Sequence, residues 1–331
     1  MGNVPPVSGI LVPAKELENL VLSLFVRVGM NNSDAQTMAE LLVLTDLRGV
    51  FSHGTWQTAG YCRMILDGKV NPRPNIRVVR QWTTTQTLDG DGGMGHLPCK
   101  QGTEWAISQA LEHGSATITT RNHFHFGGAG KYSRMAAMQN CIGIATSSHR
   151  YEPRSGNIRG ILGASPISVA LPAGEQPPVV LDMASSFLPY DETLFERMPF
   201  AFFKEIGIGA VAYGLGGVLA GIYKDELVSS SWEANQGSFI AVFNIESFMD
   251  LHEYKKEMDR WVAQARRLDP FPGYDCAELP GNLEWQRERK YAEKGIPMSD
   301  ETRKDLEGIA TELEVDTSFE KFEHTRFGEK Q

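Results

Sequence analysis

Residues 46–54 of the chain are Asp46-Leu47-Arg48-Gly49-Val50-Phe51-Ser52-His53-Gly54. The stretch follows a predicted helix and brings an arginine, a serine and a histidine close together. An imidazole exchanges protons near neutral pH, and a guanidinium binds a carboxylate through two parallel hydrogen bonds. Arg48 and His53 are therefore the groups that an oxidoreductase of 2-oxo or 2-hydroxy acids needs. The alternative is structural, with one helix ending at Gly49 and Ser52 capping the next.

The residues around this stretch predict a small helical unit. Apolar residues recur at helical spacing over residues 17–28, and Gly29 ends that helix. A second helix leads into the stretch, and a third is expected at about residues 54–67. We assign residues 1–75 to this N-terminal helical part.

The middle of the chain mixes short strands with helices and is expected to be a sheet-containing domain at residues 76–246. Strands are expected at residues 77–80, 83–88, 116–120, 142–147, 167–171, 179–183 and 238–243. Helices are expected at about residues 98–113 and 130–140. The uncharged, glycine-rich residues 206–223 are at the lower length limit for a membrane span, and we interpret them as a buried helix.

The last part of the chain is predicted to be helical. Residues 247–314 contain three helical segments that we expect to pack with the N-terminal part, and residues 315–331 form a polar, loose tail. The beginning of the chain lacks the pattern of a signal peptide, so a cytoplasmic location is expected.

Composition argues against several classes of partner. The 331 residues carry a net charge of -9 without a basic run, which disfavours nucleic acid or an anionic membrane as the main partner. The scattered cysteines indicate reduced, mostly buried thiols rather than disulfides or a zinc site. These are Cys62, Cys99, Cys141 and Cys276.

A glycine-rich turn matches the dinucleotide-binding fingerprint literally, as Gly90-x-Gly92-x-x-Gly95. A Rossmann motif needs a buried apolar strand before it and an acidic residue at the end of the next strand. Here the strand before it is largely polar, and the next strand ends in Thr120-Arg121. We therefore interpret the glycines as a tight turn that needs positive φ angles.

A second glycine-bearing loop carries two histidines, in Arg121-Asn122-His123-Phe124-His125-Phe126-Gly127-Gly128-Ala129-Gly130. His123 and His125 could bind a metal ion, but no third ligand has suitable spacing, so no metal site is expected. The other interpretation is one catalytic or cofactor-facing histidine in a loop that approaches a ligand closely. Further along, Asp182 lies at the end of a strand, where it either orients a ligand or a histidine, or caps a turn.

Together these motifs resemble the malate/L-lactate dehydrogenase family that is unrelated to Rossmann-type enzymes. Its relatives include ureidoglycolate and sulfolactate dehydrogenases, diketogulonate reductase and piperideine-2-carboxylate reductase. The resemblance extends from about residue 14 to residue 315, and Leu279-Pro280-Gly281, followed by the stretch to Gly295-Ile296-Pro297, resembles the C-terminal end of the family. It implies an α/β fold of the α+β kind, with a helical domain from both chain ends packed on a large, mainly antiparallel sheet domain. It also implies a homodimer.

The resemblance assigns roles to residues at matching positions. His53 resembles the proton donor, Arg48 the partner of the substrate carboxylate, and His125 the histidine of the family's Asn-His-Phe-Gly segment; Asp182 is a further catalytic candidate. The implied reaction moves a hydride between NAD or NADP and a 2-oxo or 2-hydroxy acid or a cyclic imine carboxylate. Cofactor-contacting segments match Ser165, Asp182, Met183, Ala184, Ser185, Ser186, Lys204, Gly281 and Asn282.

The chain departs from the family mainly on the cofactor side. Phe124 replaces an asparagine, Gln57 a frequent arginine, and Glu205 the glycine that follows a lysine. Gly163-Ala164-Ser165-Pro166 replaces Gly-Thr-Asn-Pro, and residues 182–204 form a shorter segment than in relatives. Two enzymatic hypotheses follow, and a non-catalytic binding protein is a third. One is an active dehydrogenase or reductase with a larger or more apolar substrate. The other is a repurposed member without cofactor that catalyses a redox-neutral isomerisation, cyclisation or elimination through His53 or His125.

Overall fold

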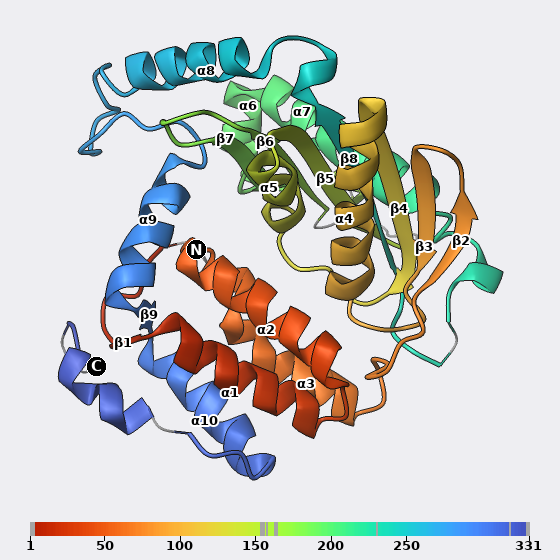
Figure 1. Ribbon diagram of the computed structural model, residues 1–331, viewed down its shortest axis with the longest axis vertical. Helices are drawn as coiled ribbons and strands as arrows, with labels where there is room; N and C mark the ends of the chain where they lie inside the picture. The colour runs from red at the N-terminus through yellow and green to blue at the C-terminus, as the bar shows by residue number, and fades with distance from the viewer. Residues whose placement is uncertain are drawn as a thin grey trace. The chain divides into compact units, whose positions relative to one another are not determined.

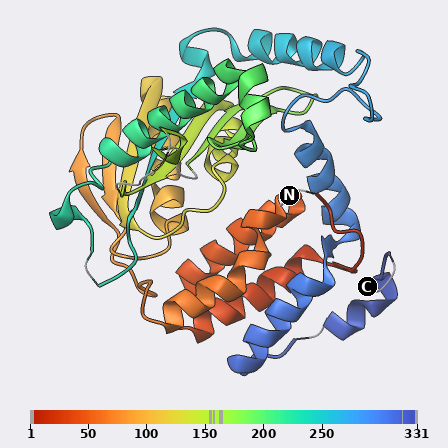
Figure 2. The ribbon, with the colours of Figure 1, turned by 180° about the vertical axis from the view of Figure 1, so that it is seen from behind.

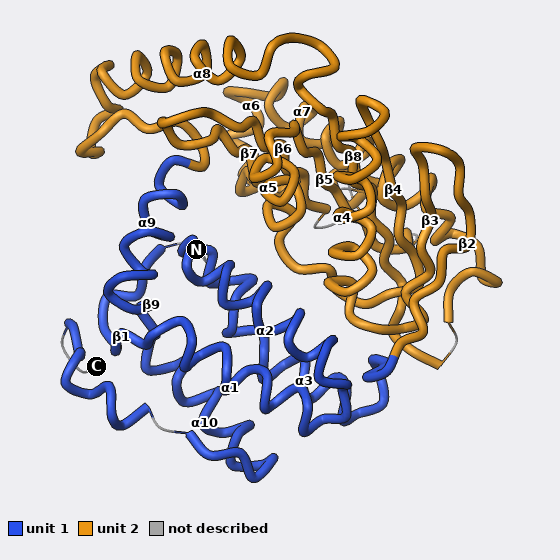
Figure 3. Tube along the Cα trace, in the orientation of Figure 1, with its two compact units in different colours: residues 1–73, 282–331 blue, residues 74–281 orange. Residues whose placement is uncertain are grey.

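The chain divides into two compact units. The computed structural model describes residues 4–152, 156, 158–161, 165–229, 231–317 and 319–328, so Gly163 and Ala164 of the expected motif lie outside the described residues. One unit consists of Met1–Arg73 with Asn282–Gln331, and the other of Pro74–Gly281 (Figure 3). Both chain ends therefore build a single unit, as the resemblance implied.

The first unit is helical (Figure 1). Its elements are β1 (Ile10–Val12), α1 (Ala14–Arg27), α2 (Asn32–Leu47), the 3-10 turns η1 (Phe51–His53) and η2 (Thr55–Gln57), α3 (Thr58–Leu66), α9 (Asn282–Lys294), β9 (Ile296–Met298), α10 (Asp300–Glu312) and η7 (Phe319–Thr325). The apolar spacing that predicted α1 forms its inner face, where Leu17, Leu24 and Phe25 are fully buried. β1 and β9 pair antiparallel and join the two ends of the chain.

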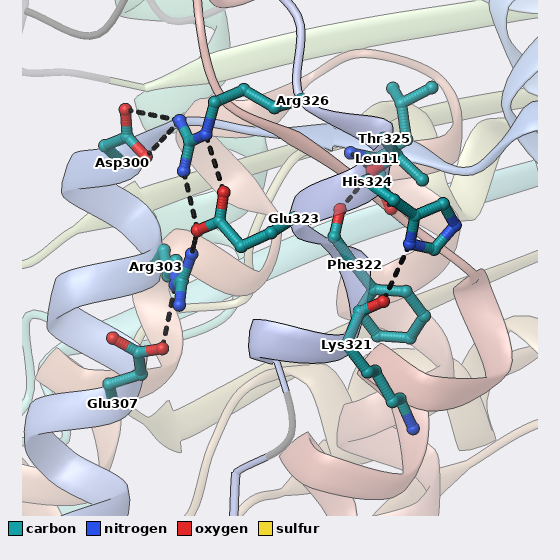
Figure 4. A network of polar contacts seen from close by, with 10 residues as sticks. All are labelled: Leu11, Asp300, Arg303, Glu307, Lys321, Phe322, Glu323, His324, Thr325 and Arg326. Carbon is teal, nitrogen blue, oxygen red and sulfur yellow. Dashed lines mark hydrogen bonds and ion pairs between the residues drawn. The ribbon is translucent and has the colours of Figure 1, made fainter.

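The described residues 319–328 are anchored rather than loose, which corrects the expectation for this part of the C-terminal tail. Glu323 accepts hydrogen bonds from both Arg303 on α10 and Arg326, as Figure 4 shows. Phe319 at the start of η7 is buried. Charged residues suggested a solvated tail, but here they form an ion-pair network with the last helix.

The second unit is built on a seven-stranded sheet. Its elements are β2 (Arg77–Gln81), β3 (Thr85–Asp89), α4 (His96–His113), β4 (Ser115–His123), α5 (Gly130–Met138), β5 (Cys141–His149), η3 (Ile158–Ile161), β6 (Pro166–Leu171), β7 (Val179–Ala184), α6 (Glu192–Arg197), α7 (Pro199–Ala212), the π-helix η4 (Tyr213–Val218), η5 (Asp225–Leu227), β8 (Gln236–Asn244), η6 (Ile245–Ser247) and α8 (Leu251–Ala265). The strand order is β2-β3-β4-β8-β5-β6-β7. Every neighbouring pair of this described sheet is antiparallel except β3 and β4, which α4 connects. The mainly antiparallel sheet is therefore confirmed.

Helices cover the two faces of the sheet differently. α4 and α5 lie on one face (Figure 1), where Leu88, Ile118, Phe126 and Tyr132 form a fully buried core. α7 and η4 lie on the opposite face (Figure 2). The helix expected to be buried at residues 206–223 leaves much of its surface exposed, so that expectation was wrong. Within the described residues, no helix has the length and apolar character needed to cross a membrane.

α8 belongs to the sheet unit, so the C-terminal part of the helical unit begins at Asn282 instead of residue 247. The Asp259 carboxylate on α8 accepts backbone N–H groups from Gly174 at 2.9 Å and from Gln176 at 2.9 Å. These bonds hold the helix on the turn between β6 and β7. Helical periodicity alone does not show which unit an amphipathic helix joins.

Candidate functional site

The stretch at residues 46–54 is a helix end followed by two tight turns, where a single new helix had been expected. Buried Asp46 accepts hydrogen bonds from the Thr55 backbone N–H at 3.0 Å and from the Thr55 hydroxyl at 2.5 Å. A Cβ on Gly54 would lie 1.7 Å from Asp46 Oδ1. Asp46 and the missing side chain at Gly54 therefore set the path of the turn that carries His53.

Arg48 is held by a carboxylate from the other end of the chain. Its buried side chain donates through Nε to Glu288 Oε2 on α9, at 3.0 Å and across 240 positions of sequence. This contact uses one of the five N–H donors of a guanidinium. The ion pair fixes the orientation of Arg48. Bidentate hydrogen bonding to a planar carboxylate depends on such a fixed orientation.

His53 is half-buried and is oriented by its neighbour. Ser52 Oγ lies 2.8 Å from His53 Nδ1, and the tautomer of the ring decides which of the two donates. Gln57 Nε2 donates to the Ser52 carbonyl at 2.7 Å. Gln57 replaces a possible second carboxylate partner in the family pattern, and here it braces the turn that presents Ser52 and His53.

A cavity of about 500 Å³ lies beside the same stretch. Its wall includes Asp46, Phe51, Ser52, Trp56 and the β9 strand, but neither Arg48 nor His53. The two candidate catalytic side chains therefore do not open into this cavity, and we do not assign it to the substrate.

The glycine-rich turn before α4 has its backbone donors occupied. The N–H groups of Gly90, Gly92 and Gly95 donate to the carbonyls of Arg121, Asn122 and Phe124 at 2.9, 2.9 and 3.1 Å. Gly92 has a φ of +72° and lies so close to Trp232 that a Cβ would approach that ring to 2.2 Å. A phosphate-binding loop needs accessible N–H groups. The interpretation as a tight turn is confirmed.

His123 is a structural histidine. It is fully buried, its Nδ1–H donates to the Phe124 carbonyl at 2.7 Å, and its Nε2 therefore accepts from the Thr120 hydroxyl at 2.7 Å. Burial lowers the pKa of His123 to about 4, so the ring is neutral near pH 7. With both nitrogens engaged, His123 does not join His125 in a metal site. Among the described residues, no group of three or more His, Cys, Asp or Glu side chains is placed to hold a metal ion.

His125 lies in a loop that sequence analysis described incompletely. Its ring meets the buried ring of His96 edge-on, with 6.4 Å between centroids. Gly127, at a φ of +81°, brings two nitrogens close to the backbone: a Cβ there would lie 2.5 Å from His96 Nε2 and 2.7 Å from Lys131 Nζ. Lys131 is buried. A cation is unfavourable at the start of a helix, so the position of Lys131 at the start of α5 was the sequence signal that could have identified it as a candidate residue.

Asp182 connects β7 with the loop that carries His125. Its Oδ2 accepts the Gly130 N–H at 3.1 Å, so the carboxylate lies at the N-terminus of α5, where negative charge is favourable. A Cβ on Gly130 would lie 2.3 Å from the same oxygen. The structure therefore brings together Asp182 and one end of the loop, in agreement with an orienting role.

The serines matched to cofactor segments fall into two groups. Ser165 and Ser185 are buried; Ser165 Oγ is 3.0 Å from Ser148 Oγ, and the Ser165 carbonyl accepts the Ser185 N–H at 2.7 Å. Met183 and Ala184 end the edge strand β7, and Ser186 beyond them is exposed. Ser165 and Ser185 therefore support the segment from inside, and the exposed Ser186 at its end is available to a ligand.

The remaining matched residues are spread over both units. Lys204 is exposed on α7, with Nζ 5.6 Å from the centre of the Phe200 ring. Gly281 has a φ of +92° and leaves no room for a side chain against Val180, whose Cβ would be 2.7 Å from an added Cβ. Asn282 is buried at the start of α9. Lys204 is the cation of this set that a phosphate could reach.

Comparisons with known proteins identify the family of this chain. The family described as malate/L-lactate dehydrogenase matches residues 12–197 and 191–307. A malate dehydrogenase of Pyrococcus horikoshii is 28% identical, covering 93% of this chain and 96% of its own, and the solved structure of that enzyme superposes with a TM-score of 0.84 over 96% of this chain. An L-sulfolactate dehydrogenase of Methanocaldococcus jannaschii is 27% identical over 92% of this chain and 97% of its own. A ureidoglycolate dehydrogenase (NAD(+)) of Escherichia coli is 25% identical over 88% of this chain and 93% of its own. Because the matched residues extend over most of the sequence, the chain belongs to the malate/L-lactate dehydrogenase family.

Proposed function

We propose that the protein transfers a hydride between a nicotinamide cofactor and a 2-oxo or 2-hydroxy acid, or a cyclic imine carboxylate. The observation that carries the proposal is the fixed turn with Arg48 and His53, in a chain whose relatives are named malate, L-sulfolactate and ureidoglycolate dehydrogenases. These names favour hydride transfer over the redox-neutral alternative. We further propose that the protein is a cytoplasmic homodimer.

Each candidate residue has a distinct task in this proposal. Arg48, oriented by Glu288, binds the substrate carboxylate with its remaining donors. His53, oriented by Ser52, gives a proton to the substrate oxygen or nitrogen during reduction and removes it during oxidation. His125 is the second acid–base candidate, and Asp182 positions its loop. A well-placed acid of this kind lowers the barrier by roughly 3–5 kcal/mol.

The residues matched to cofactor segments fit a nicotinamide dinucleotide in their chemistry. The exposed hydroxyl of Ser186 and the carboxylate of Asp182 suit ribose hydroxyls, and the exposed ammonium of Lys204 suits a phosphate. When bound, the cofactor supplies or accepts the hydride. The proposal includes both NAD and NADP.

Calorimetric titration with NADH and with NADPH tests the proposal first. Micromolar binding of one of them identifies the cofactor, and a screen of 2-oxo acids and cyclic imines then follows oxidation of the reduced nicotinamide by absorbance. His53→Ala should bind cofactor and lose turnover, whereas His113→Ala, on a partly exposed ring at the end of α4, should retain both. Absence of binding of either cofactor at millimolar concentration would refute the proposal.

A further inference from the structure

The cavity beside the 46–54 stretch has the size and the lining of a small-molecule site. Its volume is about 500 Å³, and the described residues of its wall all belong to the helical unit, which is blue in Figure 3. Ligand sites are typically cavities of roughly 300–1,000 Å³ that are mainly apolar and carry a few polar groups. Because Arg48 and His53 do not line this cavity, a ligand here occupies a place separate from the groups that we assign to the substrate.

The charged side chains of the cavity wall all have the same sign. Asp46 and Glu301 contribute carboxylates, and none of the described lining residues is a lysine, an arginine or a histidine. Asp46 is buried and Glu301 is exposed, so one carboxylate lies inside the fold and the other at its surface. Coulomb attraction therefore favours a cation in this cavity and disfavours an anion.

The start of α10, which forms part of the wall, does not reverse this preference. A helix N-terminus attracts anions through its unpaired backbone N–H groups. Here Ser299 Oγ accepts the Thr302 N–H at 3.1 Å and donates to the Thr302 hydroxyl at 3.0 Å. Glu301 lies in the same first turn, where its carboxylate opposes the positive end of the helix. The two carboxylates therefore remain the main charges that a ligand meets.

Aromatic and aliphatic side chains form the rest of the wall. Phe51 of η1 and Trp56 of η2 both line the cavity, and Trp56 is 45% exposed, so part of its indole ring is available to a ligand. The face of an aromatic ring attracts a cation, and tryptophan does so most strongly. Leu17, Ile296 and Met298 add buried apolar surface. The lining therefore matches a molecule that joins a cationic group to an apolar body.

We propose that this cavity binds a small organic cation, in which an alkylammonium group is joined to an apolar body of about the size of one aromatic ring. The carboxylates of Asp46 and Glu301 attract the ammonium group, and Trp56 contacts it through its ring. The apolar body packs on Leu17 and Met298. Binding of the cation does not depend on the proposed hydride transfer.

The cavity wall is connected to the candidate catalytic turn. Ser52 lines the cavity, and its Oγ is 2.8 Å from His53 Nδ1. Phe51 packs on the ring of Tyr291, with 6.3 Å between centroids, and Tyr291 lies on the same helix as Glu288. A bound cation therefore contacts residues that position the candidate catalytic groups. Resting on the proposed function, the cation should change kcat and should not compete with the acid for its site.

Calorimetric titration of the full chain with three probes of similar shape tests the preference for a cation. The probes are phenethylammonium, the neutral phenethyl alcohol and the anionic hydrocinnamate. Phenethylammonium should bind about tenfold more tightly than the alcohol, and hydrocinnamate should not bind. The advantage of the ammonium probe should decrease as salt is added, because Glu301 is exposed. Equal affinities for the cationic and anionic probes, or no binding of phenethylammonium at millimolar concentration, would overturn the proposal.

Substitutions in the wall locate the probe. Glu301→Gln removes a charge and keeps the shape, so it should weaken binding of phenethylammonium about threefold, as expected for an exposed ion pair, and leave phenethyl alcohol unchanged. Trp56→Ala should weaken binding of both probes. Glu312→Gln is the matched control, because Glu312 ends the same helix and pairs with Arg63, and it should bind both probes as the wild type does. Equal effects of Glu301→Gln and Glu312→Gln would place the probe outside this cavity.

The result is independent of the cofactor titration, because these probes are titrated without NADH or NADPH. A protein that binds phenethylammonium but neither cofactor would support the cation site and refute the proposed function. Where turnover of an acid is measured, an effect of phenethylammonium on kcat supports the site. Competition between phenethylammonium and the acid would overturn the proposal, because the cavity would then be part of the substrate site.

Discussion

The neutral state of His123 predicts a specific dependence of stability on pH. Its pKa falls from 6.5 to about 4 in the folded chain because the ring is buried. As the pH decreases below 6.5, the unfolded chain binds a proton that the native ring does not accept, so the native state loses stability until about pH 4. The full loss is about 3 kcal/mol, from roughly 1.4 kcal/mol for each pKa unit, and about 2 kcal/mol of it is present at pH 5.

Urea unfolding at pH 7.5 and pH 5 measures this effect. His123→Asn removes the titrating ring, so its free energy of unfolding should decrease by about 2 kcal/mol less than that of the wild type over this pH interval. The variant should also be less stable at pH 7.5, because the Thr120 hydroxyl and the Phe124 carbonyl each lose a hydrogen bond to the ring. His113→Asn, at a partly exposed ring, should follow the wild type. Parallel pH dependences of wild type and His123→Asn would refute the reasoning.

Three further substitutions probe the candidate site. Ser52→Ala should lower kcat about tenfold with little change in KM, because His53 loses the hydroxyl that orients it; steady-state kinetics at fixed cofactor measure this. Glu288→Gln should raise KM for the acid and lower the free energy of unfolding by about 1–3 kcal/mol, because Arg48 loses a charged partner; kinetics and urea unfolding measure both. Gly127→Ala should lower Tm and activity together. A side chain at the φ of +81° costs about 1–2 kcal/mol, and the added Cβ would also clash with two side-chain nitrogens. Calorimetry and steady-state kinetics measure the two effects.

The sequence predicted local elements well, and pairings between distant residues poorly. The spacing of Leu17, Leu24 and Phe25 predicted α1 because a helix must bury one face. The three-residue strands β1 and β9 were missed: Ile10 lies opposite Met298 only when the two chain ends meet. The mainly antiparallel sheet came from the resemblance to the family, because strand patterns do not state their partners.

In the candidate site, too, local features were predicted better than contacts between distant residues. Arg48 and His53 were identified because charged and titratable groups beside glycines suggest a ligand-binding turn. Glu288 was not identified, because the residue that fixes Arg48 comes from a helix 240 positions away. Motif spacing did not distinguish His123 from His125, and the resemblance to the family selected His125. The structure adds that both nitrogens of His123 are engaged inside the fold.

Residues 182–204, which the resemblance predicts to be a shortened segment, are held by a buried carboxylate, which bears on whether this side of the protein has lost its function. Glu205 is fully buried and accepts hydrogen bonds from Arg159 Nε at 3.1 Å and from the Leu188 N–H at 3.0 Å. Burial raises the pKa of Glu205, but these donors outweigh it and the pKa lies below its ordinary value. Arg159 also stacks over Tyr190 and Phe202.

Glu205 therefore faces inward, and Lys204 beside it remains exposed. Through the Leu188 N–H, the Glu205 carboxylate fixes residue 188 of this segment to α7. The two matched parts of the family pattern also meet within this segment, at residues 191–197. Loss of one partner from a buried ion pair is strongly destabilising. The buried ion pair therefore indicates that this segment has a defined conformation.

Glu205→Gln should weaken cofactor affinity and should also lower the hydrogen-exchange protection of residues 187–190. Lys204→Gln should weaken affinity and leave that protection unchanged. Equal protection in both variants would show that Glu205 does not determine the conformation of this segment.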